Sequence, residues 1–222
     1  MKKKLPMRVG IDFDNTIACY DNVFCELARS WQLVNPCFDG NKRELRDLIF
    51  TQIDGELIWQ RLQGKAYGEW IDRADSFQGF TEFLTKCRHD PDVELFIVSH
   101  KTTFGHFDEK KINLQDAARR WLHTQGFIHQ NGNAIKEDNV FFELTRENKI
   151  HRIHALQCTH FIDDLIEILD SPLFPMNTQR ILFQPACFDQ SQNNEQNKSP
   201  SRIGSPWQNH SNWTSIKNAL FS

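Results

Sequence analysis

The stretch VGIDFDNTIA, at residues 9–18, decides how the fold of this chain is interpreted. The run Met7–Ile11 is apolar apart from Arg8, which is typical of a short strand buried in a parallel sheet. Two aspartates, Asp12 and Asp14, follow at the end of this run. Because the strand ends at the first aspartate, we expect a turn that aims both carboxylates into one cleft.

Short apolar runs alternate with amphipathic helical patterns along the rest of the chain. The strand candidates are residues 7–12, 94–99, 139–142, 160–163 and 180–183. The helical patterns lie at residues 79–88, 112–125 and 147–157. This order predicts an α/β fold with a Rossmann-like parallel sheet, right-handed crossovers and helices on both faces. Ligands of such sheets collect outside the carboxyl ends of the strands.

The chain organisation departs from a simple α/β alternation in two places. About 80 residues separate the first two strand candidates, far more than one crossover helix requires. Residues 21–77 carry helical patterns and no convincing strand, so we predict a small helical cap inserted after the first strand of a core domain formed by residues 1–20 and 78–222. Residues 185–212 are rich in Gln, Asn and Ser, which predicts a polar surface loop of the core domain before a last short helix at 213–220.

The composition excludes several classes of protein. The chain has 222 residues, a net charge of −3 and 25% charged residues, so no broad cationic surface indicates a nucleic-acid or membrane partner. No apolar run approaches the roughly 18 residues that span a bilayer. The six cysteines form no CxxC pair, which indicates reduced thiols. We therefore expect a cytoplasmic protein, and the sequence leaves its oligomeric state open.

Polar residues close three of the predicted strands at the edge where ligands gather. Besides Asp12 and Asp14, they are Ser99, Asp163 and Asp164. One strand-end carboxylate is usually a helix cap or a turn residue. Four carboxylates in one cleft would raise each other's pKa values unless a cation neutralised them. Hard oxygen ligands with room for water suit Mg²⁺, so we predict Mg²⁺ as the cofactor.

Four motifs, taken in order, resemble the haloacid dehalogenase (HAD) superfamily over residues 9 to about 169. They are DFDNT at 12–16, Ser99 at the end of ELFIVS, Lys149 in NKIHRIHAL, and FIDD at 161–164. Each motif lies at the expected strand or helix end. The resemblance implies a HAD-like fold and a phosphatase-type hydrolase with a small helical cap.

The resemblance also implies a role for each motif residue. Asp12 would be the nucleophile that forms an aspartyl-phosphate. Asp14 would protonate the leaving oxygen and then deprotonate the hydrolytic water. Ser99 would donate a hydrogen bond to a phosphoryl oxygen, and Lys149 would stabilise the charge on the equatorial oxygens.

The implied metal ligands are the carboxylate of Asp12, the backbone carbonyl of Asp14, and an acid of the fourth motif. For this acid we expect Asp163 first and Asp164 second, although either could hold a metal-bound water instead. Among the other lysines, Lys101 is a weak competitor of Lys149. It is more simply a solvated surface residue, as are Lys110, Lys111 and Lys136.

The aspartate at position 14 favours phosphoryl transfer, because the dehalogenases of the superfamily lack it. We therefore expect an Mg²⁺-dependent phosphohydrolase that acts on a small phosphorylated metabolite, such as a sugar phosphate or a nucleotide. Two alternatives stay open: a phosphotransferase or phosphomutase of the same superfamily, and a non-catalytic metal-binding or interaction protein on the same fold. The candidate substrate-binding residues are Lys42, Arg43, Gln63, Lys65 and Tyr67 in the cap, with His100 and Lys101 at the cleft.

Overall fold

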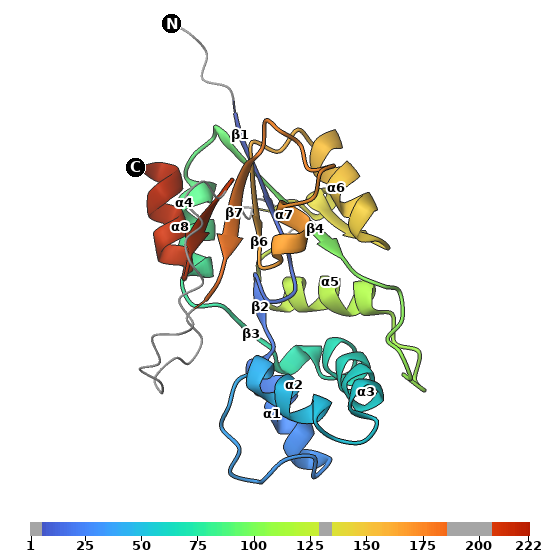
Figure 1. Cartoon of the computed structure of the whole chain (residues 1–222). Helices are drawn as coiled ribbons and strands as arrows, with labels where there is room; N and C mark the ends of the chain where they lie inside the picture. Colours follow the sequence, from blue (N-terminus) through green and yellow to red (C-terminus); the bar gives the residue numbers. More distant parts are fainter. Residues whose placement is uncertain (1–5, 129–134, 186–205) are drawn as a thin grey trace, which may run out of the picture.

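A six-stranded parallel sheet in the order β5-β4-β1-β6-β7-β8 forms the centre of the molecule. The computed structural model describes residues 6–128, 135–185 and 206–222 (Figure 1). The strands are β1 (Met7–Ile11), β4 (Val93–His100), β5 (Val140–Glu143), β6 (His160–Asp163), β7 (Gln179–Phe183) and β8 (Trp207–His210). The predicted α/β, Rossmann-like class is therefore confirmed.

Helices cover both faces of the sheet, because successive side chains of the central strands point to opposite sides. In β4, Leu95 and Ile97 pack into one apolar cluster, and Phe96 and Val98 pack into another. The first cluster includes residues of α4 (Phe80–Arg88), α5 (Leu114–Thr124) and α8 (Trp213–Phe221). The second includes residues of α6 (Arg146–Ala155) and α7 (Ile166–Leu169). A 3₁₀ turn, η2 (Glu137–Asn139), leads into β5.

Gly10, in the middle of β1, permits close packing at the centre of the sheet. A Cβ atom at this position would lie 2.6 Å from Cδ2 of Phe161. The aromatic ring therefore covers the backbone of β1, and a larger residue at position 10 would displace it.

The chain leaves and re-enters the core through two short antiparallel strands, β2 (Ala18–Cys19) and β3 (Asp75–Ser76). Between them lie α1 (Asp21–Ser30), α2 (Lys42–Phe50), α3 (Gly55–Tyr67) and the 3₁₀ turn η1 (Ile71–Arg73), which Figure 1 shows as a separate group of helices beyond one end of the sheet. The sequence predicted no strand over 21–77, so β3 corrects that expectation. Two residues are too few to produce a detectable alternation.

The C-terminal part also differs from the sequence prediction. Of the predicted polar loop at 185–212, residues 186–205 lie outside the described residues, whereas Trp207–His210 form β8 beside β7. An edge strand needs backbone pairing rather than an apolar pattern, so WQNH gave no signal. Helix α8 follows, and Trp213 Nε1 donates a hydrogen bond of 3.0 Å to the carbonyl of Thr16. The last helix is thus attached to the loop that follows β1.

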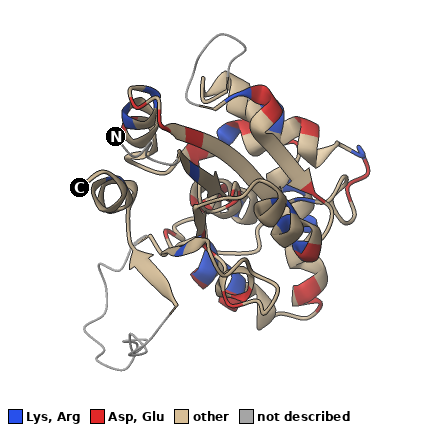
Figure 2. Ribbon diagram, turned by 90° about the horizontal axis from the view of Figure 1, so that it is seen from above, with Lys and Arg blue, Asp and Glu red and all other residues tan. Residues whose placement is uncertain are grey.

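Charges of both signs are distributed around the sheet and along the helices (Figure 2). In the described part of the chain, no helix is long and apolar enough to cross a membrane.

Candidate active site

Three neighbouring strands deliver the candidate site residues to one edge of the sheet. Strand β1 lies between β4 and β6, and Ile11 is paired with Ile97 on one side and Ile162 on the other. The amide of Asp12 donates a hydrogen bond of 2.9 Å to the carbonyl of Ile162. Asp12, Ser99 and Asp163 therefore meet at the carboxyl ends of adjacent strands, as the motif positions predicted.

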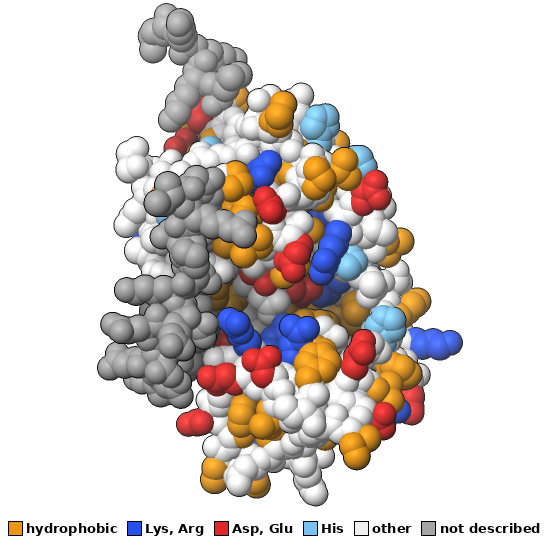
Figure 3. Space-filling model, in the orientation of Figure 1, with side chains coloured by type: hydrophobic (Ala, Val, Ile, Leu, Met, Phe, Trp, Pro, Cys, Tyr) orange, Lys and Arg blue, Asp and Glu red, His pale blue; other side chains and the backbone are white. Residues whose placement is uncertain are grey.

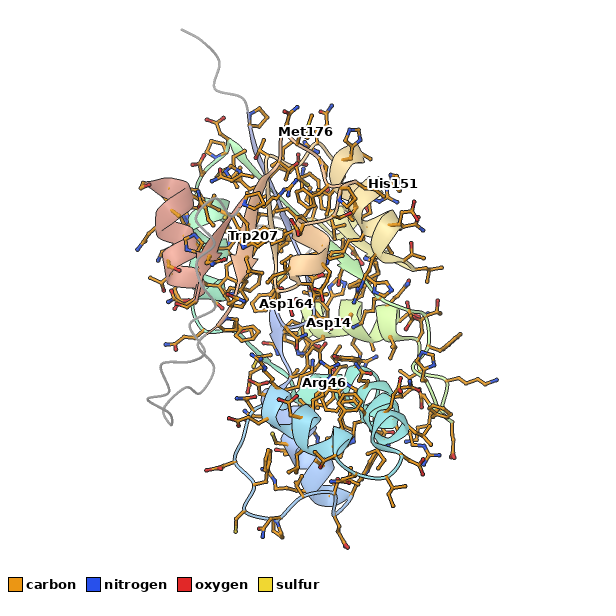
Figure 4. The ribbon with its side chains drawn as sticks, in the orientation of Figure 1. Asp14, Arg46, His151, Asp164, Met176 and Trp207 are labelled. Atoms are coloured by element: carbon orange, nitrogen blue, oxygen red, sulfur yellow. The ribbon has the colours of Figure 1, made fainter. Side chains whose placement is uncertain are left out.

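A tight turn after β1 aims Asp14 toward the same place. The amides of Ile17 and Ala18 donate hydrogen bonds of 2.9 and 3.0 Å to the carbonyl of Phe13. Asn15 completes the turn with a φ of 59°, a left-handed conformation that asparagine tolerates better than most residues. Asp14 and Asp164 line the same cavity, and Figure 4 shows both labels at the level between the sheet and the helices α1–α3.

Lys149 is buried between two of the carboxylates. Its Nζ lies 2.6 Å from Oδ1 of Asp12 and 2.7 Å from Oδ2 of Asp163, and the residue is 1% exposed. The position is the first turn of α6, after Thr145, whose side chain caps the helix by accepting a hydrogen bond from the amide of Asn148. Burial alone lowers the pKa of Lys149, but the carboxylates of Asp12 and Asp163 raise it well above its usual value. Lys149 is therefore a permanent cation in the site.

Three carboxylates form a cluster that has more negative charge than Lys149 offsets. Oxygen atoms of Asp12, Asp163 and Asp164 lie within 4.8 Å of one another. Burial raises the pKa of Asp163 to about 6, despite the opposing effect of Lys149. Burial and the charges of Asp12 and Asp163 also raise the pKa of Asp164 well above its usual value. A bound cation would remove this repulsion, so the donor set fits a hard divalent metal ion.

The hydrogen bonds of Asp163 leave room for such an ion. Its Oδ1 accepts a hydrogen bond of 3.0 Å from the amide of Leu165. Its buried Oδ2 is near the Lys149 ammonium but accepts no well-aligned hydrogen bond from the described residues. The oxygen thus has unused acceptor capacity for a metal ion.

Lys101 corrects one of the sequence expectations. The sequence favours a solvated surface position for Lys101, with substrate binding at the cleft as its candidate role. Lys101 lines the cleft but is only 3% exposed, and its Nζ lies 2.9 Å from Oδ1 and 2.7 Å from Oδ2 of Asp14. Tyr20, at the start of the cap, donates a further hydrogen bond of 2.7 Å to Oδ1 of Asp14. Each aspartate of the DFD sequence is therefore paired with its own lysine.

These residues surround a cavity of about 320 Å³. Figure 3 shows acidic and basic side chains gathered together in the hollow between core and cap. Ser99 is 1% exposed and lines this cavity. The predicted residues that line the cavity are Asp12, Asp14, Gln63, Tyr67, Ser99, His100, Lys101, Lys149 and Asp164.

The remaining candidates do not line this cavity, and one of them, the metal-ligand candidate Asp163, is fully buried. Arg43 is exposed on α2. Lys65 forms an ion pair with Glu69 and lines a neighbouring cavity. Lys42 does not line the active-site cavity either, but its Nζ donates hydrogen bonds of 2.8 Å to Asn15 Oδ1 and 2.9 Å to the Tyr67 hydroxyl. It thus connects the cap to the turn after β1.

The cavity includes residues that the sequence did not single out as binding residues. Gln60 lies one helical turn before Gln63 and Gly64 on α3, so the spacing 60, 63, 64 and 67 could have identified this face of the helix. Arg146 lies three residues before Lys149 on α6, and this spacing could likewise have placed it on the same face of its helix as Lys149. Nothing in the sequence indicated that Tyr20 binds Asp14.

His100 lines the cavity as a neutral side chain. Its Nε2 forms a hydrogen bond of 3.1 Å with the carbonyl of Leu144. Burial, together with the charges of Lys149 and Arg146, lowers its pKa. The ring is thus suited to hydrogen bonding rather than to holding an anion.

Comparisons with known proteins agree with this arrangement. No protein-family model matches the sequence, and no curated protein matches it significantly. A solved HAD-superfamily hydrolase of subfamily IA, variant 1, from Geobacter sulfurreducens is 11% identical, covers 97% of this chain and 97% of its own, and gives a TM-score of 0.53. Protein Tyrosine Kinase A of Mycobacterium tuberculosis is 12% identical, covers 99% of this chain and 100% of its own, and gives a TM-score of 0.55. The chain has the fold of the HAD-superfamily hydrolases.

Proposed function

We propose that this protein is an Mg²⁺-dependent phosphohydrolase that acts on a small phosphorylated metabolite through an aspartyl-phosphate. The observation that carries this proposal is the placement of Asp12, a carboxylate only 4% exposed. Asp12 lines one cavity with Lys149 and Asp164, and the fully buried Asp163 lies beside it. A buried carboxylate held next to a permanent cation can act as a nucleophile toward a phosphoryl group.

Each step uses a group of this chain. Asp12 attacks phosphorus, the bond from phosphorus to the ester oxygen breaks, and protonated Asp14 gives its proton to the leaving oxygen. Water then attacks the aspartyl-phosphate, gives its proton to Asp14, and releases phosphate and the Asp12 carboxylate. Ser99 Oγ would donate a hydrogen bond to a phosphoryl oxygen, and Lys149 would balance the charge beside Asp12.

A metal ion has a plausible set of ligands. The carboxylate of Asp12 and the backbone carbonyl of Asp14 would hold Mg²⁺, and either Asp163 or Asp164 would provide the third ligand. When bound, the ion would neutralise charge on the phosphoryl oxygens.

The cavity supports a small substrate with hydrogen-bonding groups. A volume of about 320 Å³ lies at the lower end for small-ligand sites. Gln60, Gln63 and Tyr67 of the cap present amide and hydroxyl groups to it. These groups suit the hydroxyls of a sugar phosphate or a nucleotide.

One observation also favours a second candidate, a phosphotransferase. The enclosure that leaves Asp12 4% exposed would protect an aspartyl-phosphate from water until an acceptor arrives. The similar Protein Tyrosine Kinase A of Mycobacterium tuberculosis carries the name of a phosphotransferase, which is compatible with this chemistry. A transferase would release phosphate slowly alone and would form a new ester when a sugar or another hydroxyl acceptor is added.

The test is phosphate release from an aryl phosphate and from a panel of small phosphomonoesters, with Mg²⁺ and with a chelator. We expect metal-dependent turnover in the wild type and none in Asp12→Asn. Wild-type enzyme that is quenched during turnover should contain a phosphorylated peptide with residue 12, and Asp12→Asn should lack it. Asp116→Asn, an exposed aspartate of α5, is the matched control and should keep full activity. An Asp12→Asn variant with the wild-type rate would refute the proposal. Metal binding by a folded wild type that neither hydrolyses nor transfers phosphate would instead favour a non-catalytic binding protein.

A further inference from the structure

Lys101 is a buried cation for which the mechanism above has no role. We propose that Lys101 is a positioning residue that fixes the Asp14 carboxylate for proton exchange with the leaving oxygen. This role rests on the proposed function, since it concerns a step of the same reaction. It differs from the role expected from the sequence, in which Lys101 would bind the substrate directly.

The contacts of Asp14 define the proton-exchanging oxygen. A carboxylate offers about four acceptor positions. Lys101 Nζ lies 2.9 Å from Oδ1 and 2.7 Å from Oδ2, and Tyr20 donates to Oδ1 at 2.7 Å. Two donors therefore occupy Oδ1, whereas Oδ2 keeps an acceptor position. We assign proton exchange to Oδ2.

Lys101 is itself held firmly. Its amide donates a hydrogen bond of 2.8 Å to the carbonyl of Glu143, and its carbonyl accepts one of 2.8 Å from Gln115 Nε2. The ammonium lies 5.2 Å from the ring centre of Phe13 and 5.1 Å from that of Tyr67. These contacts restrict a side chain that would otherwise have many rotamers, so Lys101 can restrict Asp14 in turn.

The positioning role has a clear chemical purpose. Asp14 must lie within hydrogen-bond reach of the ester oxygen when that oxygen leaves, and of the water that later attacks. Asp14 lies in the turn after β1, and its side chain has two rotatable bonds, so its carboxylate needs contacts that fix its orientation. The Lys101 Nζ contacts both oxygens of Asp14, so it would hold the carboxylate in one orientation between the loss and the return of the proton.

The test compares leaving groups in Lys101→Met and Lys101→Arg. An alkyl phosphate needs a proton on its poor leaving group, whereas an aryl phosphate with an acidic phenol hardly does. For Lys101→Met we expect kcat to fall roughly 100-fold with the alkyl phosphate and less than about 10-fold with the aryl phosphate. KM should change less than about twofold. Lys101→Arg should recover part of the loss, because a guanidinium keeps the positive charge and can donate to both oxygens of the Asp14 carboxylate. Lys110→Met, an exposed lysine of the same loop, is the control.

A double-mutant cycle tests whether Lys101 acts through Asp14. In an Asp14→Asn background, Lys101→Met should cause little further loss with the aryl phosphate. An equal loss with both esters, a loss confined to KM, or a second full loss in the Asp14→Asn background would overturn the proposal. An inactive wild type would contradict the proposed function itself. An active wild type with an unaffected Lys101→Met variant would contradict only the role of Lys101.

Discussion

Replacement of Lys149 by methionine should strongly destabilise the protein, because it leaves Asp12 and Asp163 close together without their shared cation. At an effective dielectric constant of about 20, two unit charges 2.7 Å apart attract each other by roughly 6 kcal/mol. Desolvation offsets much of this gross attraction. Removal of one partner of a buried charge pair typically costs about 3–5 kcal/mol, and we expect the free energy of unfolding to fall by this amount in metal-free buffer.

The loss should also depend on pH. The pKa of Asp163 is about 6 in the folded protein and 3.8 for an unperturbed aspartate, so the folded state binds this proton more tightly. The resulting stabilisation is fully present below about pH 4 and is lost as the pH rises through about 6. Without Lys149 the folded-state pKa rises further. The Lys149→Met variant should therefore lose more stability at about pH 8 than at about pH 5.

Urea denaturation at both pH values, with a chelator present, measures these effects. Lys86→Met, an exposed lysine on α4, controls for the substitution itself. The double variant Lys149→Met/Asp163→Asn should recover part of the lost stability, because it removes one of the unpaired carboxylates. If Lys149→Met were as stable as the wild type, or if its loss did not vary with pH, the electrostatic interpretation of the site would be wrong.

Two further substitutions test how the cap is attached. Lys42→Met should lower the free energy of unfolding by about 1–3 kcal/mol and also lower kcat/KM, because Asn15 and Tyr67 lose the donor that they share. Thermal denaturation and turnover assays measure the two effects, and the exposed Arg43→Met is the control. Gly105→Ala should cost about 1–3 kcal/mol, since the new Cβ would lie 2.6 Å from Cα of Gly64 in α3. Glu109→Ala, at an exposed position of the same loop, is the control. If Gly105→Ala had the same melting temperature as this control, the close packing of Gly105 on α3 would not contribute to stability.

The fold could be predicted because the strands that carry it have unambiguous patterns. Buried runs such as ELFIVS have the apolar character of central parallel strands, and β4, β5 and β6 are each followed in the chain by a helix. The HAD-like fold and the meeting of Asp12, Ser99, Lys149 and Asp163 follow from this order, because parallel strands end at the same edge. Strand β8 could not be predicted, since Trp207 is its one large apolar residue and the strand is defined by its backbone pairing with β7.

The parts of the site that depend on tertiary contact could not be predicted. Lys101 is as polar as any surface lysine, and only the closeness of Asp14, Phe13 and Tyr67 makes its burial favourable. The same holds for Lys42, which the sequence named as a substrate-binding candidate without indicating its hydrogen bonds to Asn15 and Tyr67. Its position becomes intelligible only when α2 lies over the turn after β1.

The central place of β1 also bears on when the proposed active site forms during folding. Arg8 forms hydrogen bonds with Glu94, 86 residues away, and with Thr159, 151 residues away. Such distant pairings form late in folding, because the chain must close long loops before it gains the contacts. The four charged groups of the site, Asp12, Lys149, Asp163 and Asp164, cannot assemble until β1 is inserted between β4 and β6. During refolding, catalytic turnover should therefore return later than the circular dichroism signal of the helices. The recovery of turnover would then report when β1 enters the sheet.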